Sequence, residues 1–448
     1  MELRRNIYKK LLAWKKENTG RVLELQGARQ VGKTYILKKF GKENFSKMVY
    51  INMAENTGKN FSRCISIAME WEPGKPMEET PIRKALELYD ETFKDNKDTV
   101  VIIDEIQESA EIYNQIRTLA REFQAYVIVT GSYLGRTMEP DFFLPAGDMD
   151  HMVMESMTFD EFLDVFDEQE LYEKIDLYGK GRTEDYKKLM EYYEIYQKIG
   201  GYPAVVACYA EYRDLNKCMG LIGDLINVFA DESKRYFEDI NMFQKLFNAI
   251  ALLMMQEKQG IRDLTAELSK IAYQEESGRT TKKMINHAIS WLQESHIIGY
   301  ASKAVDCDYK QIKDNSRYYF LDMGIAYYFL SRTGAPYDVI KGLLAENFVY
   351  LVLRRRIENT HEIAGLVPWF ASYEKIKGEL DFYVRSLVDY KNYGIEVKST
   401  DASAKTARKL LEDGKLDYLY LLKGETMGGI ADGRIFTVPL CLADRIEF

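Results

Sequence analysis

Few cysteines and no long apolar run occur in this chain of 448 residues. Its five cysteines are scattered and form no C-x-x-C pair, which argues against a zinc site and a disulfide framework and favours a reducing cytoplasm. No stretch of about 18 apolar residues is present, so we expect no membrane span. The first 20 residues are basic and amphipathic without a continuous apolar core, and they do not resemble a signal peptide. We therefore expect a cytoplasmic protein.

An excess of basic residues is also missing, because the net charge is −9. This net charge argues against a nucleic-acid-binding protein whose whole surface is basic, although it is compatible with a local basic patch. Hydrophobic residues make up 46% and charged residues 29%, as in globular proteins rather than disordered ones. The length predicts about three domains.

The strongest motif is GARQVGKT at residues 27–34, a G-x-x-x-x-G-K-T loop. It lies between an apolar run that predicts a strand and a stretch that predicts a helix, which is the context of a phosphate-binding loop. Backbone N–H groups would surround phosphate oxygens, helped by the positive end of the helix. Lys33 would reach the β- and γ-phosphates of ATP, and the Thr34 hydroxyl would bind Mg²⁺. The predicted nucleotide-binding residues of this loop are Gly27, Ala28, Arg29, Gln30, Val31, Gly32, Lys33 and Thr34.

An acidic pair follows a second apolar run, TVVIIDE at residues 99–105. The continuous Val/Ile run predicts a parallel strand buried on both faces, with its acids at the carboxyl end where ligands bind in open α/β sheets. Asp104 suits the role of holding Mg²⁺, and Glu105 suits that of a base that positions the attacking water.

A third strand is predicted at residues 125–129 and ends in Thr-Gly-Ser. Ser132 could contact the nucleotide, or it could be an N-cap that opens the next helix. Arg136 lies just beyond and could reach a phosphate, with an exposed surface charge as the alternative.

These three segments together resemble the AAA-type ATPases of bacteria and archaea. The resemblance extends to the later segment Gly200-Gly201-Tyr202-Pro203 and to residues 157–163, MTFDEFL. Family members usually carry a Gly-Arg pair before the latter stretch, where this chain has Gly147-Asp148. If that arginine acts on the γ-phosphate of a neighbouring subunit, its absence affects the hydrolysis mechanism or the oligomeric state. The nearby substitutes are Arg117, Arg121 and Arg136.

The middle of the chain is helical in pattern. The resemblance implies a small helical lid at residues 157–237. Residues 238–335 then follow the order of a winged helix. Such a unit could bind DNA through Lys282, Lys283 and His287. Alternatively, it serves for packing or protein contact, with the lysines on a solvent-exposed face. The predicted helices cover Phe243–Gln256, Ile261–Ala272 and Thr280–Ser295, and the wing strands cover Ile297–Ser302 and Arg317–Leu321.

A second candidate centre lies near the C-terminus. Asp381 in one predicted strand and Glu396-x-Lys398 in the next match the D…E-x-K signature of restriction-endonuclease-like folds. Strand alternation places Glu396 and Lys398 on one face. Two carboxylates can hold Mg²⁺, and a lysine beside them can stabilise the attacking water or the charge on a phosphate. Glu346, in a preceding helix, would be a further metal ligand. The AAA-type family also tends to carry such a C-terminal domain.

The expected fold class is α/β. Its four modules are a P-loop ATPase core (1–156), a helical lid (157–237), a winged-helix-like unit (238–335) and a restriction-endonuclease-like α/β domain (336–448). One functional hypothesis is a Mg²⁺-dependent ATP hydrolase whose nucleotide state controls DNA binding or cleavage. The other is a nucleotide-dependent switch that binds a protein partner, with a catalytically silent C-terminal domain. A homo-oligomer is compatible with both.

Overall fold

The structure is a computed structural model that describes residues 2–70, 81–132, 140–143, 145, 147–237, 241–255, 264–273, 279–360, 362–400 and 404–448. The chain divides into two compact units. The N-terminal unit contains residues 5–155 together with 294–296, and the C-terminal unit contains residues 1–4, 156–293 and 297–448. Each unit is described by itself.

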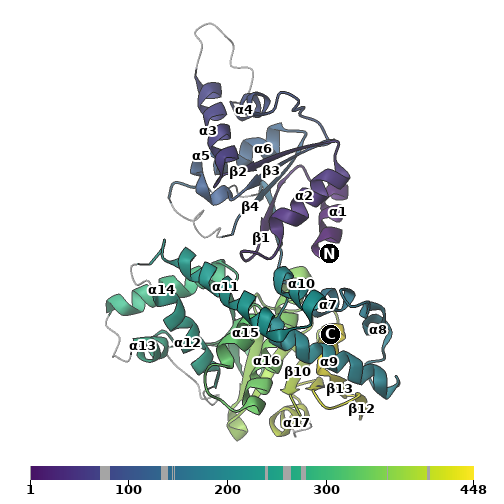
Figure 1. Ribbon diagram of the computed structural model, residues 1–448. Helices are drawn as coiled ribbons and strands as arrows, with labels where there is room; N and C mark the ends of the chain where they lie inside the picture. The colour runs from purple at the N-terminus through teal and green to yellow at the C-terminus, as the bar shows by residue number, and fades with distance from the viewer. Residues whose placement is uncertain are drawn as a thin grey trace. The chain divides into compact units, whose positions relative to one another are not determined.

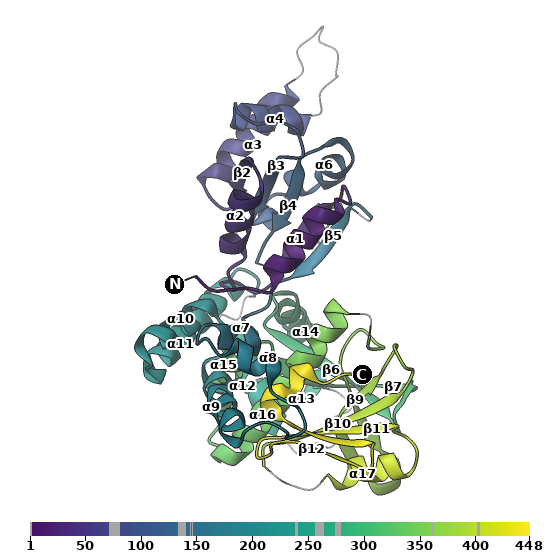
Figure 2. The same ribbon diagram turned by 90° about the vertical axis from the view of Figure 1, so that its right-hand side faces the viewer.

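A five-stranded sheet forms the centre of the N-terminal unit, with the strand order β2-β3-β4-β1-β5 (Figures 1 and 2). Every neighbouring pair in this order is parallel. The β3 strand is buried along its whole length, as its continuous Val/Ile run predicts. The strands are β1 (Val22–Gln26), β2 (Lys47–Asn52), β3 (Thr99–Asp104), β4 (Tyr126–Thr130) and β5 (Met149–Val153).

Helices cover both faces of this sheet. One face packs on α3, α4, α5 and α6, whose apolar side chains share a core with alternate residues of β2, β3 and β4. The opposite face packs on α1 and α2, since Trp14 of α1 contacts Tyr126 edge to face and Gly41 of α2 lies against Ile102. The helices are α1 (Ile7–Glu17), α2 (Lys33–Asn44), α3 (Asn56–Met69), α4 (Pro81–Tyr89), η1 (Ile106–Glu108), α5 (Ala110–Tyr113) and α6 (Ile116–Glu122).

The C-terminal unit begins with helices and continues into an α/β region. Its helices are α7 (Phe159–Asp164), α8 (Gln169–Lys174), α9 (Thr183–Ile199), α10 (Pro203–Tyr212), α11 (Leu215–Ser233), α12 (Met242–Met255), α13 (Leu264–Tyr273), α14 (Arg279–Glu294), α15 (Met323–Leu330), α16 (Tyr337–Asn359), α17 (Lys405–Glu412) and the 3-10 helices η3 (Glu374–Ile376) and η4 (Leu440–Arg445).

One mixed sheet of eight strands runs through this unit, in the order β12-β13-β11-β10-β9-β8-β6-β7. The α17 helix shares a core with one face of it, and α16 contacts β10 from the other side (Figure 2). The strands are β6 (Ile298–Val305), β7 (Asp308–Phe320), β8 (Trp369–Tyr373), β9 (Gly378–Arg385), β10 (Asn392–Lys398), β11 (Tyr418–Lys423), β12 (Gly429–Ala431) and β13 (Ile435–Pro439).

This arrangement differs from the four predicted modules in two places. The predicted wing strands are β6 and β7, and β6 pairs in parallel with β8, so one sheet crosses the predicted boundary at residues 335 and 336. Residues 157–237 are helical as expected, but they group with the C-terminal unit rather than with the P-loop core. The physical reason is apolar packing, because Phe159 and Tyr193 contact Phe348 of α16. The winged-helix elements occur in the predicted order, although Gln256 of the first helix and residues 261–263 of the second lie outside the described residues.

The Gly-Gly-Tyr-Pro segment is a buried junction inside the C-terminal unit. The N–H of Gly201 donates to Asp322 Oδ2 at 2.8 Å, and its carbonyl accepts from the Met157 N–H at 2.7 Å. Asp322 also caps α15 by accepting from the Gly324 N–H at 2.8 Å. A Cβ on Gly201 would lie 2.0 Å from the Met157 carbonyl oxygen, so only glycine fits there.

Candidate functional site

The loop between β1 and α2 has the backbone geometry that its glycines permit. Gly27 has φ 141° and Gly32 has φ 101°, and Gln30 also adopts a positive φ of 65°. A Cβ on Gly27 would lie 2.1 Å from the Met154 carbonyl oxygen, so the loop passes directly against the chain after β5. The α2 helix begins at Lys33, which places its N-terminus, with its positive dipole end, at the loop.

Lys33 is buried and turns back over its own loop. Its Nζ atom donates to the carbonyl oxygens of Gly27 at 2.6 Å and Ala28 at 2.9 Å. These hydrogen bonds hold an ammonium group inside the loop, in a setting where backbone N–H groups and a helix dipole also favour an anion.

The next residue connects the loop to the acidic strand. Thr34 Oγ1 donates to Asp104 Oδ2 at 2.6 Å. Asp104 Oδ2 also accepts from the hydroxyl of Tyr50 on β2 at 2.8 Å. Burial and the charge of Asp104 together raise the pKa of Tyr50 far above its usual range. Sequence reasoning missed Tyr50 because no motif marks it, and only the β2–β3 pairing brings it to the site.

Glu105 lies beside Asp104 in a left-handed backbone conformation, with φ 52°. Its Oε2 atom accepts from Gln107 Nε2 at 2.5 Å and from Ser132 Oγ at 3.2 Å. Arg29 donates to the same Ser132 hydroxyl at 3.4 Å. The structure therefore brings together the predicted loop, the acidic pair and Ser132 at the carboxyl ends of β1, β3 and β4, where a parallel sheet exposes its ligand site. Gln107 is a further residue that the motifs did not indicate.

Asp148 occupies the position at which the family resemblance predicts an arginine. It binds two of the three arginines that were considered as replacements for that residue. Arg121 donates to its two carboxylate oxygens at 3.0 and 3.1 Å, and Arg117 forms an ion pair with it at 3.4 Å. The hydrogen bond from Arg121 and the charges of both arginines lower the pKa of Asp148. Arg136 lies outside the described residues.

Residues 19–163 match the AAA domain family. This part of the chain is therefore similar to AAA domains. Residues 190–335 match a domain of unknown function (DUF8612), a match that crosses the predicted boundary between lid and winged helix. No curated protein matches the chain.

Two solved structures are also similar to this chain. The Walker-type ATPase PABY2304 of Pyrococcus abyssi is 15% identical over 73% of this chain and 96% of its own, with a TM-score of 0.47. The Aeropyrum pernix Orc1 protein, solved in complex with DNA, is 13% identical over 78% of this chain and 93% of its own, with a TM-score of 0.29.

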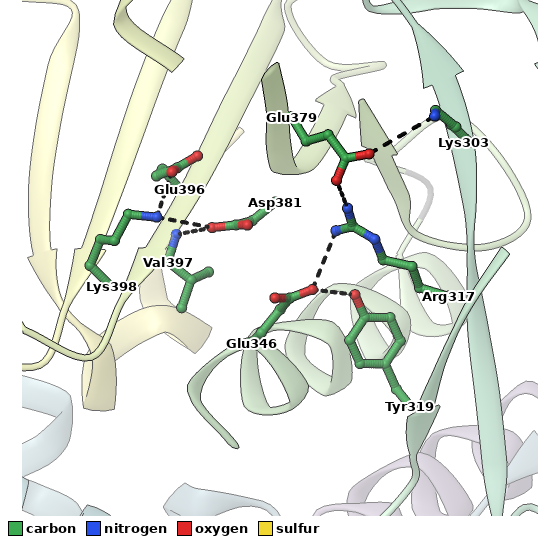
Figure 3. A network of polar contacts seen from close by, with 9 residues as sticks. All are labelled: Lys303, Arg317, Tyr319, Glu346, Glu379, Asp381, Glu396, Val397 and Lys398. Carbon is green, nitrogen blue, oxygen red and sulfur yellow. Dashed lines mark hydrogen bonds and ion pairs between the residues drawn. The ribbon is translucent and has the colours of Figure 1, made fainter. Parts of the chain in front are cut away.

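Outside the AAA domain, the second candidate centre is assembled on β9 and β10 (Figure 3). Lys398 Nζ lies 2.6 Å from Glu396 Oε1 and 3.8 Å from Asp381 Oδ2. Asp381 Oδ2 also accepts from the Val397 N–H at 2.8 Å, which fixes the carboxylate against β10. Asp381 and Glu396 are buried, whereas the Lys398 side chain is 25% exposed. The D…E-x-K residues thus lie together as their spacing predicts.

Glu346 lies in α16 as expected but belongs to a different set of contacts. Its Oε1 atom accepts from Tyr319 Oη at 2.6 Å and from Arg317 Nη1 at 3.4 Å, both from β7 (Figure 3). Arg317 also hydrogen-bonds Glu379, which forms a second, looser ion pair with Lys303 at 3.9 Å. Burial opposes the charge of Arg317, but the carboxylates of Glu346 and Glu379 raise its pKa above the usual value. The sequence did not predict this role for a wing strand.

Within the part of the chain that the structure describes, no three His, Cys, Asp or Glu side chains form a metal-binding group. The predicted set of Glu346, Asp381 and Glu396 is therefore not brought together as a three-carboxylate site. Asp381 and Glu396 remain a suitable pair of hard oxygen donors around the Lys398 ammonium group. Such a pair fits Mg²⁺, which proteins often bind through one or two carboxylates with water and substrate phosphates.

The remaining predictions concern the winged-helix region and membranes. His287 of α14 packs edge to face on Phe237 with ring centroids 5.3 Å apart, which favours the packing alternative for this residue. Lys283 is exposed on the same helix. Among the described helices, none combines the length and apolar character that crossing a bilayer requires.

Proposed function

We propose that the AAA domain binds ATP with Mg²⁺ and hydrolyses it. The main support is the 2.6 Å hydrogen bond from Thr34 Oγ1 to Asp104 Oδ2. It joins the two residues that are suited to bind a nucleotide-associated Mg²⁺. Mg²⁺, when bound, would neutralise charge that develops on the phosphates. Thr34 and Asp104 would hold it at the end of the phosphate loop, with Tyr50 orienting the Asp104 carboxylate.

Lys33 would exchange its partners when the nucleotide binds. Its two carbonyl hydrogen bonds keep the ammonium group in the loop, and phosphate oxygens are stronger acceptors for an ammonium group than neutral carbonyls. The N–H groups of residues 27–34 would surround the same phosphates. Lys33 thus stabilises negative charge on the transferred phosphoryl group.

Glu105 would position the attacking water. It lies next to Asp104 but has different partners, since Ser132 and Gln107 hold its Oε2 atom. A carboxylate that is oriented by neutral donors and not bound to the metal suits a general base. Ser132 would then have its effect through Glu105 as a positioning residue.

Hydrolysis by the chain on its own should be slow. Asp148 engages both Arg117 and Arg121, and arginine fingers are worth about 10³–10⁵-fold in related nucleotide hydrolases. An activating partner, or a second copy of the chain, would then raise the rate. Measuring ATP hydrolysis against protein concentration would detect self-activation.

For the C-terminal unit we propose that nucleotide state controls DNA binding or cleavage at Asp381, Glu396 and Lys398. In this proposal Asp381 and Glu396 would hold Mg²⁺, and Lys398 would stabilise the attacking water or the charge on the scissile phosphate. The supporting observation is that Lys398 Nζ lies within ion-pair distance of both carboxylates. The alternative is a nucleotide-dependent switch for a protein partner, and the engagement of Glu346 by Arg317 and Tyr319 favours a silent centre.

One experiment separates these alternatives. Labelled single- and double-stranded DNA is incubated with Mg²⁺, with and without ATP, and with the parent chain, Asp381→Ala and Lys33→Ala. An ATP-controlled nuclease loses cleavage in Asp381→Ala and changes its ATP response in Lys33→Ala. Glu412→Gln, an exposed acid on α17, is the matched control and should cleave like the parent. No cleavage by any form, with ATP binding intact and little salt-dependent DNA affinity, favours the partner-binding switch.

A further inference from the structure

Arg317 joins the wing strand β7 to two acids of the nuclease-like region. Its two terminal nitrogens point to different carboxylates, Glu346 on α16 and Glu379 on β9 (Figure 3). The guanidinium carbon also lies 4.0 Å from the centroid of the Phe370 ring on β8. The side chain is only 17% exposed. Only arginine can bridge two carboxylates with a planar group that also stacks on an aromatic ring.

The position of this ion pair relates it to the D…E-x-K centre. Glu379 and Asp381 are two residues apart on β9, but the pairing of β9 with β8 is shifted between Leu380 and Tyr383, so strand alternation does not decide the face of Asp381. Figure 3 shows the Asp381 carboxylate between the Lys398 ammonium group and Glu346. The Asp381 charge also contributes to the raised pKa of Arg317, which places the guanidinium within reach of its field. Glu346 therefore faces the same region as Asp381 but is bound by groups from β7.

Tyr319 strengthens the hold on Glu346. It donates to Glu346 Oε1 at 2.6 Å from a position two residues along β7, on the same face as Arg317. Its ring is stacked on Tyr350 of α16 with centroids 4.3 Å apart. One strand thus supplies two partners of the Glu346 carboxylate.

We propose that Arg317 is an autoinhibitory contact that keeps Glu346 from joining Asp381 and Glu396 as a third ligand to a divalent cation. The inference rests on the proposed function, in which Asp381 and Glu396 hold that cation. Arg317 lowers cation affinity in two ways: it occupies Glu346, and its own positive charge repels the metal. Because arginine stays protonated at all ordinary pH values, the contact responds to displacement of β7 and not to pH.

The β7 strand is placed for such displacement. It is the last strand of the sheet order and pairs with β6. Their register is irregular at Ser302/Lys303 and at Lys303/Val305, where the regular ladder is interrupted. Edge elements with interrupted ladders open at lower free energy than central strands. Movement of this edge would withdraw Arg317 and Tyr319 together.

The test measures Mn²⁺ binding to the full chain without nucleotide, by electron paramagnetic resonance of free Mn²⁺. The signal of interest is the binding that Asp381→Asn removes. We expect Arg317→Met to increase the affinity of this site about tenfold or more. The matched control Arg332→Met removes a positive charge from an exposed position on the turn after α15 and should leave the affinity unchanged.

A double-mutant cycle with Glu346→Gln gives the decisive comparison. In the parent chain Glu346→Gln should not alter Mn²⁺ affinity, because Arg317 and Tyr319 already bind the Glu346 carboxylate and keep it from the metal. In the Arg317→Met background it should remove most of the gain. If Arg317→Met fails to fold, Arg317→Lys is used instead. It retains the positive charge without the planar guanidinium group and should give a smaller increase in Mn²⁺ affinity.

Two results would overturn the inference while leaving the proposed cation centre in place. One is loss of affinity on Glu346→Gln in the parent chain, and the other is Asp381-dependent binding that Arg317→Met and Arg317→Lys do not change. Absence of Asp381-dependent binding in the parent and in the Arg317 variants would instead contradict the cation centre of the proposed function.

Discussion

Each unit of the chain holds a lysine within a polar centre, and the two lysines differ in their partners. Lys33 in the AAA domain donates to two neutral backbone carbonyls, at 2.6 and 2.9 Å. Lys398 in the C-terminal unit lies beside two carboxylates, at 2.6 and 3.8 Å. A carbonyl orients an ammonium group without cancelling its charge, whereas a carboxylate neutralises it.

This difference favours an anion beside Lys33 and a cation beside the acids around Lys398. The loop around Lys33 adds backbone N–H groups and a helix N-terminus, all of which favour phosphate. The acids around Lys398 carry the greater charge and favour a cation, with the lysine as their counter-ion. The same residue type therefore serves opposite electrostatic purposes, and substitutions at matched positions can test this contrast.

The largest expected effect is the loss of the loop lysine. Lys33→Ala should reduce ATP hydrolysis by about 10²–10³-fold, the usual cost of removing a preorganised group that stabilises a transition state. Phosphate release under saturating ATP measures this. Lys42→Ala, an exposed lysine on the same helix, and Lys398→Ala should both retain the parental rate. Comparable losses in Lys33→Ala and Lys398→Ala would break the contrast between the two centres.

A smaller loss is expected at the Mg²⁺ side of the AAA domain. Thr34→Ala removes the hydroxyl that donates to Asp104, and apparent Mg²⁺ affinity in ATP hydrolysis should fall by about 10–100-fold. Titration of the rate with Mg²⁺ at fixed ATP measures the change. Thr34→Ser keeps the hydroxyl and should restore most of the affinity. A Thr34→Ala enzyme with parental Mg²⁺ dependence would contradict the assigned role.

The next expected effect concerns the stability of the C-terminal unit. Gly201→Ala should destabilise the C-terminal unit by about 1–3 kcal/mol, because the new methyl group would overlap the Met157 backbone. Gly220→Ala in α11 is the matched control, since a Cβ there meets no atom within 4 Å. It should stabilise the helix by about 0.5–1 kcal/mol. Urea unfolding of both variants gives the two free energies, and equal effects would contradict the junction described above.

The smallest effect concerns pH. His151 Nδ1 lies 2.8 Å from the buried Glu24 carboxylate, and the hydrogen bond to Glu24 raises the pKa of His151 above 6.5. Since the folded pKa is raised, the contribution is complete below pH 6.5 and is lost as the pH rises through the folded pKa. The imidazole is largely exposed, so we expect only a few tenths of a kcal/mol.

Thermal unfolding midpoints of the parent and His151→Asn at several pH values test this. The difference between the two should shrink from pH 5.5 to pH 8.5, and Glu24→Gln should remove the trend. A difference that grows with pH would contradict the sign. The Arg317 ion pairs of the C-terminal unit should show no such trend, since arginine does not titrate in this range.

Local motifs were the most predictable part of the molecule. The loop at residues 27–34 lies within one strand–helix connection, so its geometry depends on adjacent residues and its glycines. The acidic strand and Ser132 were placed correctly because carboxyl ends of parallel strands share one edge. Tyr50 and Gln107 were not foreseen, since hydrogen bonds to an acid leave no pattern in the sequence.

Interactions between distant segments were the least predictable. Asp148 was recognised only as a departure from the expected arginine, and its ion pairs with Arg117 and Arg121 depend on how α6 lies beside the chain before β5. Arg317 was assigned to a wing strand, but the pairing of β6 with β8 makes that strand part of the eight-stranded sheet of the C-terminal unit. There Arg317 meets Glu346, which sequence reasoning had assigned to a metal.

The sequence by itself determined the phosphate loop, the acidic strand and the co-location of Asp381, Glu396 and Lys398, because chain connectivity and strand alternation fix these over short distances. Only the tertiary structure decided which charges neutralise one another. Arg317, Glu346 and Glu379 come from β7, α16 and β9, and their meeting follows from apolar packing and strand pairing that bury them together. A buried charge must find an opposite partner in whatever neighbourhood the core creates, and that neighbourhood is a property of the fold.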